Sequence, residues 1–500
     1  MGELPSRPGA PPETRYDEGT ATVTVWSAGV RARYVMAVGV VLALASSIVG
    51  VVRAFAMDGQ MLRGMPMADM PEMYLAGAGI VLAVVGALLR GAPPAVPAVA
   101  IPGTRSRWPV AVVATTALTI DISKTSTLGF VIPGMSGEYG LGPTGASMLA
   151  VAGLSGTAIG AVVFSHLADR IGRRASYLIA ALGFTATSLC ASMPTFLGNV
   201  VMCFLMGIAV GGLAPLLITI LTDLFPGGAR GSMVTALSVV ATAVGYLVAS
   251  GSALWLEPSY GWRVLWLIGA PTGLLLTLAA VVIPHRAPAD TRATDHPPRH
   301  VARTTFTTRL QWLYAAMVGV LTFGLTSWVP TIARAGGLAT TTANTLLTIV
   351  ALVMVPCAVM VAIAYRRLGP IPLAVLMAAG TASVLLVLTV SGLADTLVWL
   401  SAAVLAATLF AVNTMAAIFL PIAADLADPA RRGRATGTVS LFNRIGGLTG
   451  PLVLSFIVTS TTDVLTAVAT LALLCGAIAA YTGRRHRTVN AAAERELLSR

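Results

Sequence analysis

The 500-residue chain is too poor in charge for a soluble protein, because 10% of its residues are charged and 56% are hydrophobic, whereas about a quarter of the residues of soluble domains are charged. Its net charge of +12 does not indicate a nucleic-acid partner, because the basic residues cluster beside apolar runs and form no stripe with interleaved aromatic residues. No nucleophile–base set or metal-ligand spacing indicates an enzyme. Apolar runs of about 20 residues, long enough to cross a bilayer, predict an all-α polytopic membrane protein.

The first 107 residues are predicted to form a tail and an extra helical unit. Residues 1–33 have neither the apolar region nor the cleavage site of a signal peptide, and we expect a disordered cytoplasmic tail. Apolar runs at about 34–52 and 73–90 predict two spans, which form a unit with the Pro- and Ala-rich linker (34–107). The loop between the two runs holds five methionines, namely Met57, Met61, Met65, Met67 and Met70. Copper binding is the alternative to the apolar packing that we expect for them, and we predict no metal or other cofactor.

Twelve further apolar runs fall into two blocks of six, residues 108–284 and 311–483. A polar central loop (285–310) separates the blocks and a polar tail (484–500) follows the second, both predicted to be cytoplasmic. The runs lie at about 109–134, 145–167, 176–193, 197–222, 231–255 and 263–284, and then at about 311–333, 343–364, 371–391, 396–424, 435–459 and 464–482. The prediction is two six-helix bundles plus the N-terminal pair, with 14 spans in all.

The basic residues predict the orientation of the chain. With the N-terminus in the cytoplasm, 26 of the 32 basic residues fall on loops and tails that are then cytoplasmic. Both termini are therefore predicted to lie inside. Scarce lysine beside abundant arginine, alanine and glycine is typical of a GC-rich bacterial genome. We accordingly expect a bacterial cytoplasmic membrane protein. We also predict a monomer.

The two blocks repeat each other. At an offset of 197, Pro133, Leu141 and Gly172 match Pro330, Leu338 and Gly369; at an offset of 202, Asp223, Ser238 and Gly245 match Asp425, Ser440 and Gly447. Two related bundles with a binding site between them near the midplane of the membrane are typical of transporters.

The loop after the second run of the first block reads SHLADRIGRR (Ser165–Arg174) and resembles the G-x-x-x-D-R-x-G-R-R loop of the major facilitator superfamily. Five further segments follow in the order of that family: GIAVGGLAP (Gly207–Pro215), DLFPGGARG (Asp223–Gly231), YGWR (Tyr260–Arg263), TSWVPT (Thr326–Thr331) and FNRIGGLTGP (Phe442–Pro451). The resemblance covers about residues 108–485 and implies secondary transport by alternating access of two bundles. Three positions depart from the family pattern. Ser165 replaces a glycine, Cys203 stands where many members carry an arginine, and Arg366 takes the aspartate position of the second half.

The resemblance implies a conformational latch at the cytoplasmic ends of the helices. Asp169 lies just past a helix end, where it can pair with arginines and reach the N-terminal dipole of a neighbouring helix. The predicted latch consists of Asp169, Arg170, Gly172, Arg173, Arg174, Asp223, Arg230 and Asp425. Alternatively, the arginines serve only topology, and the two aspartates that repeat each other are solubility charges at helix ends.

The segment TIDISKTSTLGFVIP (Thr119–Pro133) holds the only lysine of the chain, Lys124, three residues after Asp121. An ionised side chain at the centre of a membrane helix costs about 2.5–3.5 kcal/mol, so both side chains must face protein or water. The spacing i, i+3 puts them on one helix face, where they can pair. The alternative to a functional role is a self-neutralising pair that only eases insertion. Unlike guanidinium, a buried ammonium can lose its proton, and we predict proton coupling through Asp121 and Lys124.

Arg444 is the third charge that we place within the membrane. It lies ten residues beyond Arg434, about 15 Å of helical rise, and so near the midplane. Two cations and one anion make a positive cavity that suits an anionic substrate, with Lys124 and Arg444 as binding residues. An arginine satisfied by backbone carbonyls is the alternative for Arg444. Asn413, Tyr246 and Trp328 are further lining candidates, with ordinary packing as their alternative.

These residues predict proton-coupled symport of a small organic anion of the carboxylate type. In this scheme, protonation of Asp121 frees Lys124 to bind the anion, so proton and anion load together. The segment around Lys124 is similar to the first helix of aromatic-acid:proton symporters, with Ile122 and Lys124 in place of their glycine and second acid. Drug or metabolite efflux by proton antiport is the alternative. The fifth run of the first block, AVGYLVASGSAL (Ala243–Leu254), lacks the proline that is usual in such exporters.

Overall fold

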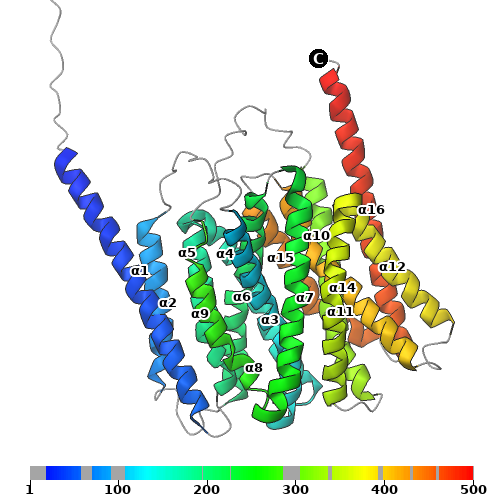
Figure 1. The fold of residues 1–500 in the computed structure, drawn as a ribbon, viewed down its shortest axis with the longest axis horizontal. Helices are drawn as coiled ribbons and strands as arrows, with labels where there is room; N and C mark the ends of the chain where they lie inside the picture. Colours follow the sequence, from blue (N-terminus) through cyan, green and yellow to red (C-terminus); the bar gives the residue numbers. More distant parts are fainter. Residues whose placement is uncertain are drawn as a thin grey trace, which may run out of the picture.

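The computed structural model describes the chain outside residues 1–17, 58–69, 92–106, 194, 226, 285–303, 336–339, 392–397, 428–431, 458–460 and 499–500. The described residues form helices joined by turns (Figure 1). The N-terminal unit contains α1 (Glu18–Phe55) and α2 (Pro71–Arg90). The N-terminal bundle contains α3 (Arg107–Tyr139), α4 (Pro143–Ile171), α5 (Arg173–Ala186), the 3₁₀ segment η4 (Thr187–Ser192), α6 (Phe196–Leu224), α7 (Gly227–Tyr260), α8 (Val264–Leu267) and α9 (Gly269–Ala279). The C-terminal bundle contains α10 (Thr304–Ala335), α11 (Thr340–Leu368), α12 (Pro370–Val390), α14 (Val398–Leu426), α15 (Arg432–Ile457) and α16 (Thr461–Leu498).

Each of the predicted apolar runs overlaps at least one of these helices. Within the described residues, eight helices are long and apolar enough to cross a membrane, and α1 and α2 are two of them. The total of 14 spans stays a prediction. Helix α1 begins at Glu18, within residues 1–33, and α16 continues to Leu498, through most of residues 484–500. The domain boundaries stay predictions.

Helices α1 and α2 pack against each other and against α5 on one flank of the N-terminal bundle (Figure 1). Gly39 and Gly79 make this close approach possible, since a Cβ at either position would lie within 2.6 Å of backbone atoms of the other helix. Arg53 in the last turn of α1 and Glu72 in the first turn of α2 form an ion pair of 2.7 Å. The pair is thus a compact hairpin.

The predicted run 176–193 is broken into α5 and η4. The hydroxyl groups of Thr185, Thr187 and Ser188 donate to backbone carbonyls one turn earlier, at 2.8, 2.7 and 3.1 Å. Such bonds compete with the backbone hydrogen bonds of the helix and bend it. This competition accounts for the change from the α-helix α5 to the tighter 3₁₀ segment η4.

The predicted run 263–284 is broken at Ile268, between α8 and α9. Pro271 follows the break, and it has no N–H to donate to the carbonyl of Leu267. Gly269 adds the low helix propensity of glycine. The breaks in these two runs lie side by side, because α8 packs against η4 and α9 against α5.

The internal repeat predicted from the sequence appears in the backbone. Gly172 between α4 and α5 has φ = 89°, and its counterpart Gly369 between α11 and α12 has φ = 86°. Both lie in the left-handed region that glycine adopts without steric cost. The two bundles therefore turn in the same way after their second helix.

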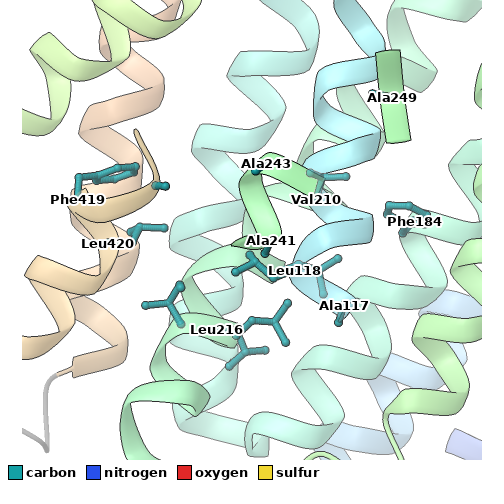
Figure 2. Packing of buried hydrophobic residues seen from close by; sticks show 14 of the residues in the cluster. Ala117, Leu118, Phe184, Val210, Leu216, Ala241, Ala243, Ala249, Phe419 and Leu420 are labelled. Atoms are coloured by element: carbon teal, nitrogen blue, oxygen red, sulfur yellow. The ribbon is translucent and has the colours of Figure 1, made fainter. Parts of the chain in front are cut away.

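One apolar core joins both bundles. It includes Leu118 of α3, Phe184 of α5, Leu216 of α6 and Phe419 of α14, and Figure 2 shows these side chains between the helices. Helices α4 and α6 pack against α15, and α7 packs against α11 and α14. Residues at these contacts consequently lie between the bundles.

Candidate functional site

Asp121 lies on α3, where it is 2% exposed. Its Oδ1 atom has no hydrogen-bond partner among the described residues. The charge of Arg444 of α15 acts on it from the opposite bundle, and Tyr177 of α5 lies near enough to sense its charge. Because a buried carboxylate is costly unless it is paired, this charge needs the cation from the opposite bundle.

Arg444 faces the N-terminal bundle from α15. Its Nε has no hydrogen-bond partner among the described residues, and its guanidinium carbon lies 5.2 Å from the centre of the Phe323 ring. The ring belongs to α10, against which α15 packs closely at Gly446 and Gly447. An arginine with an unsatisfied donor and an aromatic neighbour is equipped to bind a carboxylate.

Lys124 is also buried, at 4% exposed. Its ammonium donates to the backbone carbonyl of Trp266 at 2.9 Å and to Ser188 Oγ at 3.4 Å. It also lies over the rings of Trp266 and Phe184, 4.7 and 5.4 Å from their centres. All these partners belong to the N-terminal bundle, so the side chain runs toward α8 and η4, whereas Asp121 interacts with Arg444 across the bundle interface.

The structure describes the other predicted lining residues to different extents. Tyr246 of α7 packs against Phe130 of α3 with ring centres 6.2 Å apart. Asn413 of α14 is buried, at 9% exposed. The side chain of Trp328 lies outside the described part of α10. Tyr177, which the sequence analysis missed, has a buried hydroxyl group near the charge of Asp121, and nothing in its apolar context signalled it.

The predicted latch joins the two bundles at one end, the face at which α4 and α6 end. Asp169 accepts a hydrogen bond of 2.8 Å from Arg434 Nε of α15. Asp223 pairs with Arg173 of its own bundle and with Arg432 of α15. No latch role was predicted from the sequence for Arg432 or Arg434, although RRGR follows Asp425 much as GGARG follows Asp223.

The remaining latch candidates play different parts. Arg174 donates to the backbone carbonyl of Ile283 at 2.7 Å, and so holds α5 to the segment after α9. Gly172 forms the turn described above, and Arg170 is exposed. The side chains of Arg230 and Asp425 lie outside the described residues.

Ser165, the departure from the family loop, sits where α4 meets α15. A Cβ on Gly437 would lie 2.0 Å from Ser165 Oγ. The glycine missing from α4 is thus compensated by a glycine on the opposite bundle. On the same face Thr219 and Thr436 share a hydrogen bond of 3.1 Å, so the bundles are in close contact there.

The family model of the Major Facilitator Superfamily matches residues 111–451, more than half of the chain. The chain belongs to this superfamily. The gallate transporter of Pseudomonas putida is 30% identical over 281 residues, which cover 48% of this chain and 61% of that protein. The gentisate transporter of Corynebacterium glutamicum is 29% identical, with 52% and 61% covered. The 4-hydroxybenzoate transporter PcaK of Acinetobacter baylyi is 29% identical, with 36% and 39% covered. These matches span less than two thirds of each relative.

Solved structures of the superfamily share the fold. The human organic anion transporter MFSD10 matches with a TM-score of 0.59 and 16% identity, covering 75% of this chain and 99% of that one. The xylose transporter XylE from E. coli, in a partially occluded inward-open conformation, matches with a TM-score of 0.59 and 15% identity, covering 75% and 97%. At such identities the likeness concerns the fold alone.

Proposed function

We propose that this protein is a secondary active transporter that carries a small aromatic carboxylate together with a proton across the bacterial cytoplasmic membrane. The observation that carries the proposal is a pair of interacting charges on opposite bundles, the buried Asp121 and the partly buried Arg444, each with a side-chain atom that lacks a hydrogen-bond partner among the described residues. The names of the relatives, which refer to gallate, gentisate and 4-hydroxybenzoate, support an aromatic acid.

The proposed cycle begins with Asp121 ionised and attracting Arg444. Protonation of Asp121 removes the negative charge and frees the guanidinium group to bind the substrate carboxylate through two parallel N–H···O bonds. Proton and anion therefore load together. Lys124 as a second, competing partner of Asp121 stays a prediction, as do Tyr246, Asn413 and Trp328 as lining residues.

Alternating access then moves the loaded site between the two sides of the membrane. We assign the latch face to the cytoplasm, because it carries Arg173, Arg432 and Arg434 and cytoplasmic loops are rich in arginine. With its ion pairs formed, the described conformation is then the one closed toward the cytoplasm. This conformation suits the capture of a substrate from outside.

The test is uptake of radiolabelled 4-hydroxybenzoate by proteoliposomes that contain the purified full-length chain. We expect accumulation when the outside is acidic and loss of accumulation with a protonophore. Arg444→Gln is expected to reduce uptake at least tenfold, because a charge-assisted pair contributes roughly 1.5–3 kcal/mol. Arg366→Gln, an exposed arginine on α11, serves as the matched control. Export of a lipophilic cation under the opposite gradient, without uptake of any aromatic acid, would favour proton-antiport efflux instead.

A further inference from the structure

The environment of Lys124 is built for an ammonium group. The nitrogen lies within hydrogen-bond distance of a carbonyl oxygen and a hydroxyl oxygen, those of Trp266 and Ser188, and between two aromatic rings, those of Trp266 and Phe184. Each of these contacts compensates part of the cost of burying a charge. The lone lysine is thus satisfied inside the N-terminal bundle.

The partners of Lys124 come from the two breaks in the helices beside α3. Ser188 belongs to the 3₁₀ segment η4 that follows α5, and Trp266 to the four-residue helix α8 that precedes the break at Ile268. Irregular backbone within a membrane protein must satisfy its polar groups inside the protein, because lipid offers no partner. The ammonium group supplies donors at the point where both helices depart from the regular ladder.

Space for the ammonium group depends on Gly269, the first residue of α9. A Cβ at this position would lie 2.1 Å from Lys124 Nζ and 2.4 Å from Ser188 Oγ. One turn later, a Cβ on Gly273 would lie 2.3 Å from Thr185 Oγ1. The planar guanidinium group of an arginine is bulkier than an ammonium group. The space between Ser188, Trp266 and Gly269, here called the cradle, therefore favours lysine in a chain that otherwise uses arginine.

The extra hairpin closes the outer side of the cradle. Helix α1 packs against η4, and a Cβ on Gly50 would lie 2.8 Å from the Leu189 side chain. Leu189 is 1% exposed and directly follows Ser188. The segment that holds the ammonium group is therefore enclosed between α1 on one side and α3 on the other.

We propose that Lys124 is a positioning residue that fastens α3 to the two helix breaks, and so holds Asp121 at the interface of the bundles. Its ammonium group binds the protein itself and not the substrate. The part of the inference that concerns Asp121 rests on the proposed function, whereas the fastening of the helices does not. Lysine is required here for the size and donor geometry of its head group as well as for its charge.

The test compares Lys124→Met, Lys124→Arg, Gly269→Ala and the double variant Lys124→Met/Gly269→Ala in the full-length protein. Gly129→Ala on α3 is the control, because its Cβ would meet nothing within 4 Å. We expect each single variant to lower the melting temperature by roughly 5 °C. The double variant should melt no lower than Lys124→Met, since the new methyl group then enters space that the ammonium group has left. Additive losses, or an arginine variant as stable as the original protein, would overturn the fastening role.

Transport kinetics with 4-hydroxybenzoate separate positioning from substrate contact. A positioning role predicts that Lys124→Arg and Gly269→Ala lower the maximal uptake rate about tenfold while KM changes less than about twofold. A tenfold rise in KM without a loss of thermal stability would instead make Lys124 a substrate ligand. If the original protein takes up no aromatic acid, the proposed function fails, and the melting temperatures alone decide between fastening and no fastening. Ser188→Ala removes one acceptor of the ammonium group together with the hydroxyl's own bond to the Phe184 carbonyl. It gives the milder loss that keeps this decision possible if Lys124→Met does not fold.

Discussion

In the N-terminal bundle, helix α3 buries Asp121 and Lys124, whereas the C-terminal bundle carries Val318 and Leu321 at the corresponding positions of α10, at the offset of 197 that relates Pro133 to Pro330. All four side chains are buried. At the same offset, Asp169 of the latch corresponds to Arg366, which is exposed. Asp121 and Asp169 therefore have no acidic counterparts at the corresponding positions of the C-terminal bundle.

The backbone features of the repeat are shared much more evenly. Gly172 and Gly369 form the same left-handed turn. Gly245 lets α7 approach Ile122 of α3, and Gly447 lets α15 approach Phe323 of α10. The comparison indicates that the repeat preserves the packing of the scaffold, while the chemistry depends on side chains that only one copy carries, with Arg444 facing them from the other bundle.

The largest effect is expected for Asp121→Asn. An amide cannot carry the coupled proton, so accumulation driven by a pH gradient should be abolished while exchange of substrate continues. Counterflow and gradient-driven uptake of 4-hydroxybenzoate, measured in the same proteoliposomes, separate the two processes. A variant that still accumulates substrate against its gradient would remove the functional difference between α3 and α10.

Arg444→Lys tests whether the C-terminal bundle contributes only a positive charge to substrate binding or also two parallel N–H donors. Lysine keeps the charge but loses the bidentate geometry, and we expect substrate affinity to fall about tenfold. Thermal-shift titration with 4-hydroxybenzoate measures this loss. Unchanged affinity would show that a point charge is enough at this position.

Asp223→Asn should weaken the contact between the bundles. Asp223 pairs with Arg173 and Arg432, and the side chain of Arg432 is 3% exposed. Removing one partner of a buried ion pair costs about 3–5 kcal/mol, so the conformation that is closed at the latch should lose population. Spin-label distances between α6 and α15 on the latch face should lengthen, and unchanged distances would show that the neighbouring threonine contact is sufficient.

Gly245→Ala and Gly447→Ala test whether the scaffold is as symmetric as the repeat suggests. The new Cβ would lie 2.8 Å from the Thr119 carbonyl oxygen or 2.4 Å from the Phe323 ring. Overpacking of this kind costs roughly 1–3 kcal/mol, and both variants should melt at lower temperatures. Gly380→Ala on α12 meets nothing within 4 Å, and should be neutral or stabilising by up to about 1 kcal/mol. A lower melting temperature in only one of these two variants would show that the two glycine contacts are not equivalent.

The smallest effect is expected for Asp169→Asn. The side chains of Asp169 and Arg434 are 43% and 62% exposed, and their hydrogen bond lies at the surface. Exposed pairs contribute about 0–1 kcal/mol, so the variant should shift the latch distances less than Asp223→Asn. A larger shift than that of Asp223→Asn would show that Asp169 contributes more to the latch than Asp223 does.

The sequence alone predicted those features that depend on local pattern. Runs of apolar residues predict helices wherever they occur, and the repeat and the family loop predicted two bundles. Asp121 and Arg444 could be recognised because charge within an apolar helix is costly. The breaks at η4 and Ile268 were missed, although hydroxyl residues and a proline lie beside them.

The partners of the charged side chains were decided by the tertiary structure. Lys124 and Asp121 lie three residues apart, yet their described contacts lead to different places, because α3 is packed on several sides by helices from distant parts of the chain. A helix that is largely apolar all round has no stripe that tells which of its faces meets the opposite bundle. Arg432 and Arg434 likewise gained partners only when α15 was packed beside α4 and α6. The positions of the apolar helices and the identity of their charged residues follow from local composition, whereas the partner of each charged side chain follows from long-range packing.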